Sequence, residues 1–212
     1  SINMTSDKEA KITSMKSTFE NCENIEKITI IGFKTSEIES LSKIFYGTNL
    51  SIFDIDGLEI NNVKDMSFLF ANNKANKIDL SKLETSQVTS MSYMFYGSSF
   101  ENLNLSNFVT DNVEDMSHIF EDCTKLRLLD ISKFNTSKTK DMNSMFSNCI
   151  SLENVNLNFY NTKNVKNMAG MFRYTRFRNI QLKNFDTSQV TDMSCMFQYS
   201  GGMRMDISSF NT

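Results

Sequence analysis

The chain contains no proline, no tryptophan and a single histidine, His118, among its 212 residues. That histidine has no acid–base partner within its motif, no nucleophile motif is present, and no glycine-rich phosphate loop occurs, so the parts needed for catalysis are missing. We therefore expect a protein that is not an enzyme and that has no cofactor. The ligand spacings of zinc sites and calcium loops are also absent, so we expect no metal site.

The net charge of the chain is small, and long apolar runs are absent. The net charge of −3 leaves no basic footprint for nucleic acid, so we expect no nucleic-acid partner. No apolar run approaches the roughly 20 residues that cross a bilayer, so we expect no transmembrane segment. A hydrophobic content of 40% and a charged content of 22% are ordinary for a folded domain and argue against disorder.

What the chain has in abundance is phenylalanine and methionine, 18 and 14 residues, and both follow a repeated motif. The motif is clearest at Met91-Ser-Tyr-Met-Phe95 and recurs every 25 or 26 residues. Its eight copies begin at Met15, Leu41, Met66, Met91, Met116, Met142, Met168 and Met193. A period of this length is typical of leucine-rich repeats, so the sequence predicts a solenoid of about eight repeats.

The two halves of each repeat predict different elements. One half alternates apolar and polar residues, as in Leu103-Asn-Leu105, which predicts a short strand with one face buried. The other half spaces Val190, Met193, Met196 and Phe197 as on one face of a helix, with Thr191 or Asp192 placed to cap it. We therefore expect an α/β solenoid, with short parallel strands on one side and short helices on the other.

The domain boundaries follow from the repeat. Residues 1–14 precede the first motif and are expected to form an N-terminal cap or a partial repeat, followed by one solenoid over residues 15–212. The last repeat breaks off at Thr212 and no signal peptide precedes Ser1. We expect both ends to be cuts in a longer protein, made by processing or by the choice of segment.

Three of the four cysteines share one register of the repeat. Cys22, Cys123 and Cys149 each follow the last Phe of a motif by three residues. Cys123 and Cys149 would lie one strand spacing apart, about 5 Å, within reach of a disulfide. The alternative, which we favour, is a pair of free thiols buried in the solenoid.

The segments Leu103-Asn-Leu-Ser-Asn-Phe108 and Phe185-Asp-Thr-Ser-Gln-Val-Thr-Asp-Met-Ser-Cys-Met-Phe197 resemble the repeats of BspA-like leucine-rich repeat surface proteins. The similarity covers residues 15–212 and is weakest in the second repeat, where Leu41 replaces the leading Met. The resemblance implies a cell-surface or extracellular protein that adheres to host or neighbouring-cell molecules. It implies no single ligand, since the shared residues belong to the core.

Candidate binding residues are those that point outward from the predicted strands. They form a polar surface made of Asp54, Asp56, Asp79, Asn104, Asp130, Asn156, Gln181 and Asp206. Like charges on neighbouring strands repel, which hints at a cation or a basic partner. Such residues also keep an exposed sheet soluble and discourage edge pairing, and this alternative stays open.

A second candidate site is the segment around Arg173, Tyr174 and Arg176, with Tyr199 one repeat further on. Arginine and tyrosine are enriched at interface hot spots, although a solvated turn has the same composition. The combined pattern predicts an adhesin that binds an extracellular or host protein, or alternatively a structural stalk that presents another domain. The oligomeric state is left open.

Overall fold

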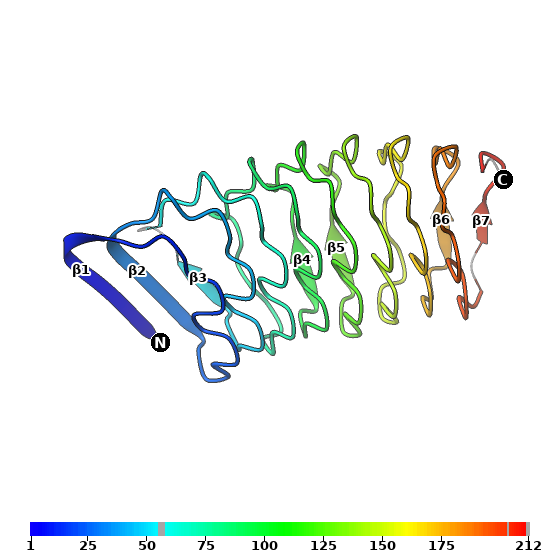
Figure 1. Cartoon of the computed structure of the whole chain (residues 1–212). Helices are drawn as coiled ribbons and strands as arrows, with labels where there is room; N and C mark the ends of the chain where they lie inside the picture. Colours follow the sequence, from blue (N-terminus) through cyan, green and yellow to red (C-terminus); the bar gives the residue numbers. More distant parts are fainter. Residues whose placement is uncertain (55–57, 203, 211–212) are drawn as a thin grey trace.

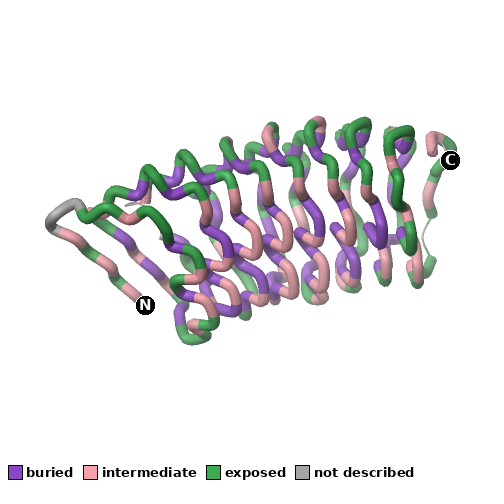
Figure 2. The backbone as a smooth tube through the Cα atoms, in the orientation of Figure 1, coloured by how far each residue is buried: buried purple, intermediate pink, exposed green. Residues whose placement is uncertain are grey.

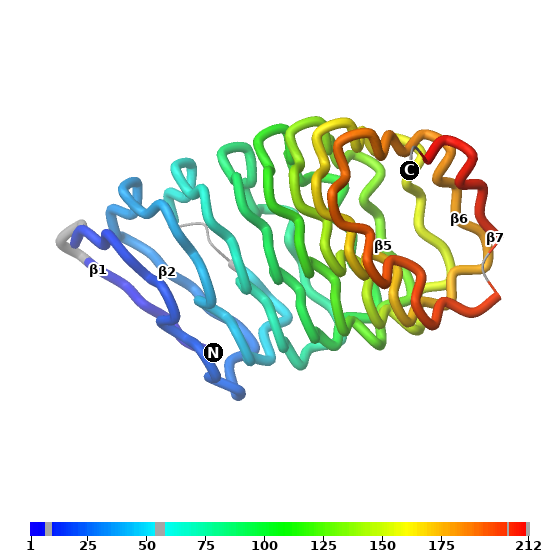
Figure 3. Tube along the Cα trace, turned by 45° about the vertical axis from the view of Figure 1, so that its right-hand side comes forward, coloured from blue at the N-terminus to red at the C-terminus, as the bar shows by residue number. Residues whose placement is uncertain are grey.

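The protein is an elongated stack of parallel coils, with its two termini at opposite ends of the stack (Figures 1 and 3). The computed structural model describes residues 1–54, 58–202 and 204–210, without the side chains of residues 7–9 and 54. Each turn of the solenoid corresponds to one 25- or 26-residue repeat. Buried residues recur along the inside of every coil (Figure 2).

Within the part of the chain that the structure describes, seven strands form the sheet side of the stack. They are β1 (Ile2–Lys11), β2 (Lys27–Lys34), β3 (Ile52–Asp54), β4 (Asn102–Asn104), β5 (Leu128–Asp130), β6 (Asn179–Gln181) and β7 (Arg204–Asp206). All pairings are parallel, in the orders β1-β2-β3, β4-β5 and β6-β7. Equivalent positions pair across coils, as Leu103 does with Leu129. The alternating apolar and polar pattern is thus used as the sequence predicts.

The predicted helices are wrong. No described residue is helical, and the protein is an all-β solenoid. Consecutive tight turns occupy the motif: Met94 N donates to Met91 O at 3.1 Å, and Ser98 N donates to Phe95 O at 3.0 Å. The third residue of each turn is left-handed, Tyr93 with φ 58° and Gly97 with φ 62°, as a type II turn requires. A left-handed residue every fourth position prevents a helix from forming.

The N–H groups between these turns bond to the next coil. Met91 N, Tyr93 N and Phe95 N donate to Asp115 O, Ser117 O and Ile119 O, each at 3.0 Å. Single parallel bridges continue the same ladder along the stack, through Ser40, Asp65, Ser90, Asp115, Asp141, Asn167 and Asp192. The motif therefore satisfies its backbone groups partly within its own coil and partly on its neighbour.

A column of stacked phenylalanine rings forms the centre of the core. The last Phe of every motif stacks on its counterpart in the next coil, from Phe19 to Phe197, with ring centroids 5.7–6.0 Å apart. The six rings from Phe45 to Phe172 within this column are almost completely buried. One coil alone cannot bury its apolar face, so stacking is what stabilises each repeat.

The cysteines are free thiols, and Cys123 and Cys149 are not bridged. Each thiol donates instead to a carbonyl of the preceding coil, Cys123 to Phe95 O and Cys149 to Phe120 O, both at 3.0 Å. Burial raises the pKa of the Cys123 thiol to about 12. Both groups are thus held as neutral thiols that act as core residues.

None of the described segments forms a helix of the length and apolarity that would cross a bilayer.

Candidate functional site

The polar column predicted on the strand face lies there and is exposed. Its exposed members are Asp79, Asn104, Asp130, Asn156, Gln181 and Asp206. Asp54 ends β3, where its side chain is not described, and Asp56 lies outside the described residues. The column therefore runs along the sheet side of the solenoid from coil to coil.

Most of these side chains cap a turn of their own backbone. Oδ1 of Asp79, Asn104 and Asp130 accepts the N–H two residues later, in each case from a serine at 3.0 Å. Asn156 and Asp206 make the same bond, at 3.1 and 3.0 Å. This geometry needs a short side chain with an acceptor oxygen, which both Asp and Asn provide.

The same hydrogen bonds set the electrostatics of the column. Bonds from the backbone and hydroxyl of Ser81 lower the pKa of Asp79, and bonds from Ser132 lower the pKa of Asp130. The carboxylates are therefore stabilised as anions by their own turns. These hydrogen bonds offset the repulsion between neighbouring carboxylates that the sequence indicated. The column therefore does not by itself require a basic partner.

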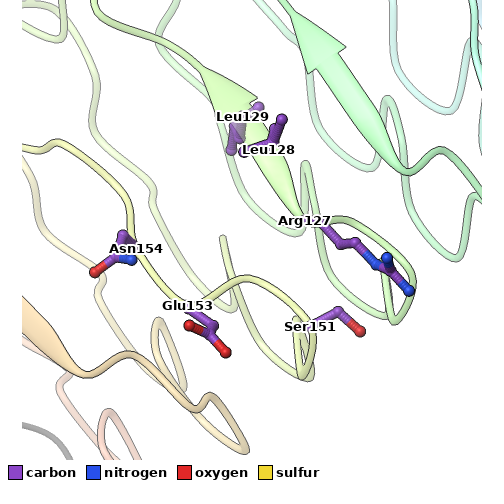
Figure 4. Close-up of a pocket in the computed structure, with 6 residues that line it drawn as sticks. All are labelled: Arg127, Leu128, Leu129, Ser151, Glu153 and Asn154. Atoms are coloured by element: carbon purple, nitrogen blue, oxygen red, sulfur yellow. The ribbon is translucent and has the colours of Figure 1, made fainter.

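A hollow opens on the strand face where the sheet is interrupted. Between β5 and the following coil, among the described residues, no strand pairing is formed. A cavity of about 580 Å³ lies there, lined by Arg127, Leu128, Leu129, Ser151, Glu153 and Asn154 (Figure 4). Leu128 is 67% exposed beside it, and Glu153 is paired with Arg178 at 3.0 Å.

The second predicted site lies on the turn side of the solenoid. The Tyr174 ring stacks on Tyr199 of the next coil, with centroids 4.9 Å apart and planes 9° apart. The guanidinium of Arg173 lies 4.8 Å from the centre of the Tyr174 ring. Arg176 is exposed two residues further on. We call Asn148, Arg173, Tyr174, Arg176 and Tyr199 the Tyr174 corner.

Two hollows flank Tyr174 and share Asn148. One, of about 390 Å³, is lined by Asn148, Ile150, Tyr174, Thr175, Arg176, Tyr199 and Gly201. The other, of about 340 Å³, is lined by Glu121, Asp122, Ser147, Asn148, Arg173 and Tyr174. The structure thus brings together the predicted residues Arg173, Tyr174 and Arg176 and adds Asn148 and Asp122, which the sequence did not single out.

The chain matches a family described as "Mycoplasma protein of unknown function, DUF285", over residues 13–128 and 114–212. The chain belongs to the DUF285 family. This membership agrees with a BspA-like repeat protein, and it carries no function of its own. No curated protein and no solved structure matches the chain.

This DUF285 chain carries a further aromatic column that the sequence reading missed. Phe68, Tyr93 and His118 stack in successive coils, with centroids 4.4 and 4.2 Å apart. Lys43 Nζ lies 5.2 Å from the Phe68 ring, and His118 Nδ1 lies 2.6 Å from Glu121 Oε2. All four side chains occupy the third position of their motifs. That shared register was the signal in the sequence, and it was hidden because a helix was expected there.

Among the side chains that the structure describes, no group of three or more from His, Cys, Asp or Glu is placed to hold an ion. The side chains of the Tyr174 corner make hydrogen bonds, a ring stack and a cation–π contact.

Proposed function

We propose that this chain is the binding module of a cell-surface or secreted protein, an adhesin that contacts host or neighbouring-cell macromolecules through its solenoid surface. Two findings support the proposal. The repeats resemble BspA-like surface proteins, and the chain belongs to a family of repeat-containing proteins consistent with that resemblance. Solenoids of this kind present long surfaces on which contacts from successive repeats add up.

The observation that carries the proposal is the exposure of tyrosine and arginine at the Tyr174 corner. Tyr174 is 40% exposed and Arg176 is exposed two residues later, although the core of every coil is already filled by its own stacked Phe. Tyr, Trp and Arg are the residue types that dominate binding hot spots. Tyr174 and Arg176 are therefore available for a partner.

Backbone geometry adds to this argument. Tyr174 and Tyr199 have φ of 57° and 58°, at a slot where other coils place glycine or asparagine, such as Gly97 and Asn148. A bulky residue in this region costs on the order of 1 kcal/mol or more, and such costs concentrate at functional sites. The solenoid accepts that cost where Gly or Asn would fold more easily.

The strand face is the second contact surface of the proposed adhesin. Its acidic column is explained by turn capping, so a basic extracellular protein is a weaker partner there than the sequence suggested. The hollow beside Leu128 adds apolar exposed area to that face.

The test is binding of the purified chain to immobilised extracellular-matrix and cell-surface proteins, and to whole host cells. Three variants locate the contact: Tyr199→Ala with Arg173→Ala at the corner, Asp79→Asn with Asp130→Asn on the strand face, and Phe159→Ala as a control. Phe159 is 70% exposed and belongs neither to the polar column nor to the Tyr174 corner. Loss of binding in the corner variant alone is expected. Silence of the unmodified chain towards all proteins and cells would refute the adhesin function.

A stalk that presents another domain is the alternative. The unbroken stack of Phe rings from Phe19 to Phe197 favours it, because such a column makes a stiff spacer. In the full-length protein, an unrelated rod of equal length would then replace this segment without loss of cell adhesion. An adhesin would lose adhesion in the same exchange.

A further inference from the structure

We infer that the hollow between β5 and the following coil binds an extended acidic peptide, which adds a short strand to the free edge of β5. The peptide backbone pairs with Leu129, an apolar side chain of the peptide contacts Leu128, and a carboxylate of the peptide pairs with Arg127. This inference goes beyond the adhesin function, because it assigns a separate ligand to the hollow and does not use the Tyr174 corner.

The two coils beside the hollow are joined on the turn side and open on the strand side. On the turn side, Asp141 is bridged to Asp115 and to Asn167. On the strand side, β5 pairs with β4 but, in the described part of the chain, with no residue of the next coil. Described coils continue in both directions from this point (Figure 1). The opening therefore belongs to the interior of the stack.

Two consecutive 26-residue repeats meet at the opening, residues 116–141 and 142–167, and each carries its extra residue in the turn before the strand position. The second of these coils is attached to the coil after it. Glu153 O accepts from Arg178 N at 3.1 Å, and the Glu153 carboxylate pairs with Arg178 Nη2 at 3.0 Å. The start of its strand position is thus held away from β5.

The opening leaves part of the core uncovered. Leu129 and Val155 hold core positions on the two sides of the opening, yet both are only partly buried. Leu103 and Ile180, at the same position of other coils, are 3% and 0% exposed. An apolar group that enters the opening would remove this surface from water, which favours its binding.

The backbone of β5 has a free edge at the same place. Leu128 N donates to Glu101 O of the preceding coil at 3.2 Å. Successive residues of a strand direct their backbone groups to opposite sides, so the N–H and C=O of Leu129 face the hollow. No described residue pairs with these two groups. Unpaired groups on a strand edge are a template for an added strand, and an extended peptide supplies both the donor and the acceptor.

The side chains around the hollow select the peptide (Figure 4). Its volume of about 580 Å³ falls within the roughly 300–1,000 Å³ that is typical of ligand pockets. Leu128 is 67% exposed at its rim and offers an apolar contact. Glu153 is neutralised by Arg178, whereas Arg127 is exposed and makes no ion pair within the described structure. The free charge in the lining is therefore positive, which favours a carboxylate.

The probes are end-blocked hexapeptides in which apolar and polar residues alternate and one terminal position is Glu, Gln or Lys. We expect the purified chain to bind the Glu series at least tenfold more tightly than the Lys series. Methylation of the peptide backbone nitrogens should abolish binding, because an added strand must donate through its N–H groups.

The neighbouring coils supply a substitution that the fold accepts. Leu128→Asn introduces the residue that Asn102 and Asn179 provide at the same position of other coils, and it should weaken peptide binding at least tenfold. Ile52→Asn is the matched control. Ile52 holds this position on β3 and is 50% exposed, but the sheet there is paired with the coils on both sides. Its replacement should leave peptide binding unchanged.

The charge preference has its own variant. Arg127→Asn places in β5's coil the residue that Asn76 provides at the same position, and it should remove the preference for Glu over Lys. Several outcomes would overturn the peptide site. They are no binding in any series, binding that Leu128→Asn leaves intact, an unchanged preference in Arg127→Asn, or equal binding of the methylated peptides.

Thermal melting checks the fold of each variant. If Leu128→Asn fails to fold, hydrogen exchange of the unmodified chain decides, because a bound Glu peptide must protect the Leu129 amide and an unchanged exchange rate refutes the added strand. The adhesin function is tested with other ligands, so the two can fail separately. A chain that binds host proteins but no peptide keeps the adhesin and refutes the peptide site.

Discussion

At the scale of single residues, the hydroxyl of Tyr160 stands out because it is buried without a hydrogen-bond partner among the described residues. Tyr160 holds the slot that Phe134 and Phe185 occupy in the neighbouring coils. We expect Tyr160→Phe to raise the free energy of unfolding by about 1 kcal/mol, since it removes a desolvated polar atom and keeps the ring. Urea unfolding measures this, with Tyr46→Phe as the control.

The control removes a hydroxyl that is used. Tyr46 Oη accepts from Asn72 Nδ2 at 2.7 Å, so Tyr46→Phe should lower stability where Tyr160→Phe raises it. A destabilised Tyr160→Phe would mean that the hydroxyl has a partner in solution.

The same phenol gives a pH dependence. Burial raises the pKa of Tyr160 in the folded state, whereas an unfolded tyrosine titrates near 10. Because the folded state holds the proton of Tyr160 more tightly than the unfolded state, the free energy of unfolding is unaffected by this group below pH 10. It falls as pH rises above 10, where the unfolded chain loses the proton first. The stability advantage of Tyr160→Phe over the unmodified chain should therefore widen between pH 10 and 11. Parallel unfolding curves at pH 8 and pH 11 test this, and a constant difference would contradict it.

The capped carboxylates of the strand face make an opposite prediction. Hydrogen bonds from Ser132 lower the pKa of Asp130 in the folded state. Asp130 therefore stabilises the fold at pH values above its unfolded pKa of about 4, and this stabilisation is lost as pH falls below that value. Asp130→Asn keeps the acceptor that Asn104 uses and should be close to neutral at pH 7. Asp130→Ala removes it and should cost under about 1 kcal/mol. Equal effects of the two variants in urea unfolding would argue against the cap.

This column shows where sequence reasoning succeeds and stops at the residue scale. The alternation of apolar and polar residues placed Asp79, Asn104 and Asp130 outside correctly. Their role was not visible, because an Asx turn depends on the backbone curling back two residues later. The exchange of Asp for Asn along the column was the available clue, since a binding carboxylate is not replaced freely but a turn acceptor is.

At the scale of elements, the motif shows why the expected helix was wrong. Apolar residues at Val190, Met193, Met196 and Phe197 fit a helical face, but successive tight turns place the same positions inside. One position of the motif could have distinguished tight turns from a helix. In successive coils it holds Asn21, Gly47, Asn72 and Gly97, all of which have positive φ. Gly and Asn at fixed turn positions favour positive φ rather than a helix interior. The length of the repeat and the residues of the stacked core could be predicted from the sequence. The conformation of the backbone within the motif could not.

Replacing a glycine of the motif by alanine distinguishes a helix from a series of tight turns, because the change in stability has opposite signs in the two cases. Gly170 has φ +61°, and an added Cβ would meet Ser144 Oγ at 3.1 Å and Arg173 Cβ at 3.9 Å. Gly→Ala in a helix stabilises by up to about 1 kcal/mol, whereas Ala at positive φ is strained. We expect Gly170→Ala to destabilise by about 1 kcal/mol in urea unfolding. Gly97→Ala should cost more, because its Cβ would overlap Asn72 Oδ1. A stabilised Gly170→Ala would favour the helix.

At the scale of the whole molecule, stability is distributed along one dimension. Each coil contacts only its neighbours, so end coils have one stacking partner and central coils have two. Phe197 stacks on Phe172 on one side, whereas Phe120 is stacked between Phe95 and Phe146. Opening should therefore start at the ends and require the most free energy in the middle.

The four cysteines report on this gradient because they lie at different points of the stack. Cys195 is exposed near one end, Cys22 is half-buried near the other, and Cys123 and Cys149 are buried in between. Only the thiolate reacts, and burial keeps the central thiols protonated. With a thiol-specific reagent under native conditions, Cys195 should react first and Cys22 more slowly. Cys123 and Cys149 should react last, at the rate of global unfolding.

Variants that keep one cysteine each assign a reaction rate to each thiol. Low concentrations of denaturant make the difference between the end coils and the central coils easier to measure. If ends open before the centre, denaturant should accelerate Cys22 at concentrations where Cys123 and Cys149 still do not react. Central thiols that react together with Cys22 would mean that the solenoid opens in one cooperative step, and nearest-neighbour stacking would then not describe its stability. Strong protection of the centre alone would place the rigid part of the molecule around the coils of Phe120 and Phe146, next to the Tyr174 corner.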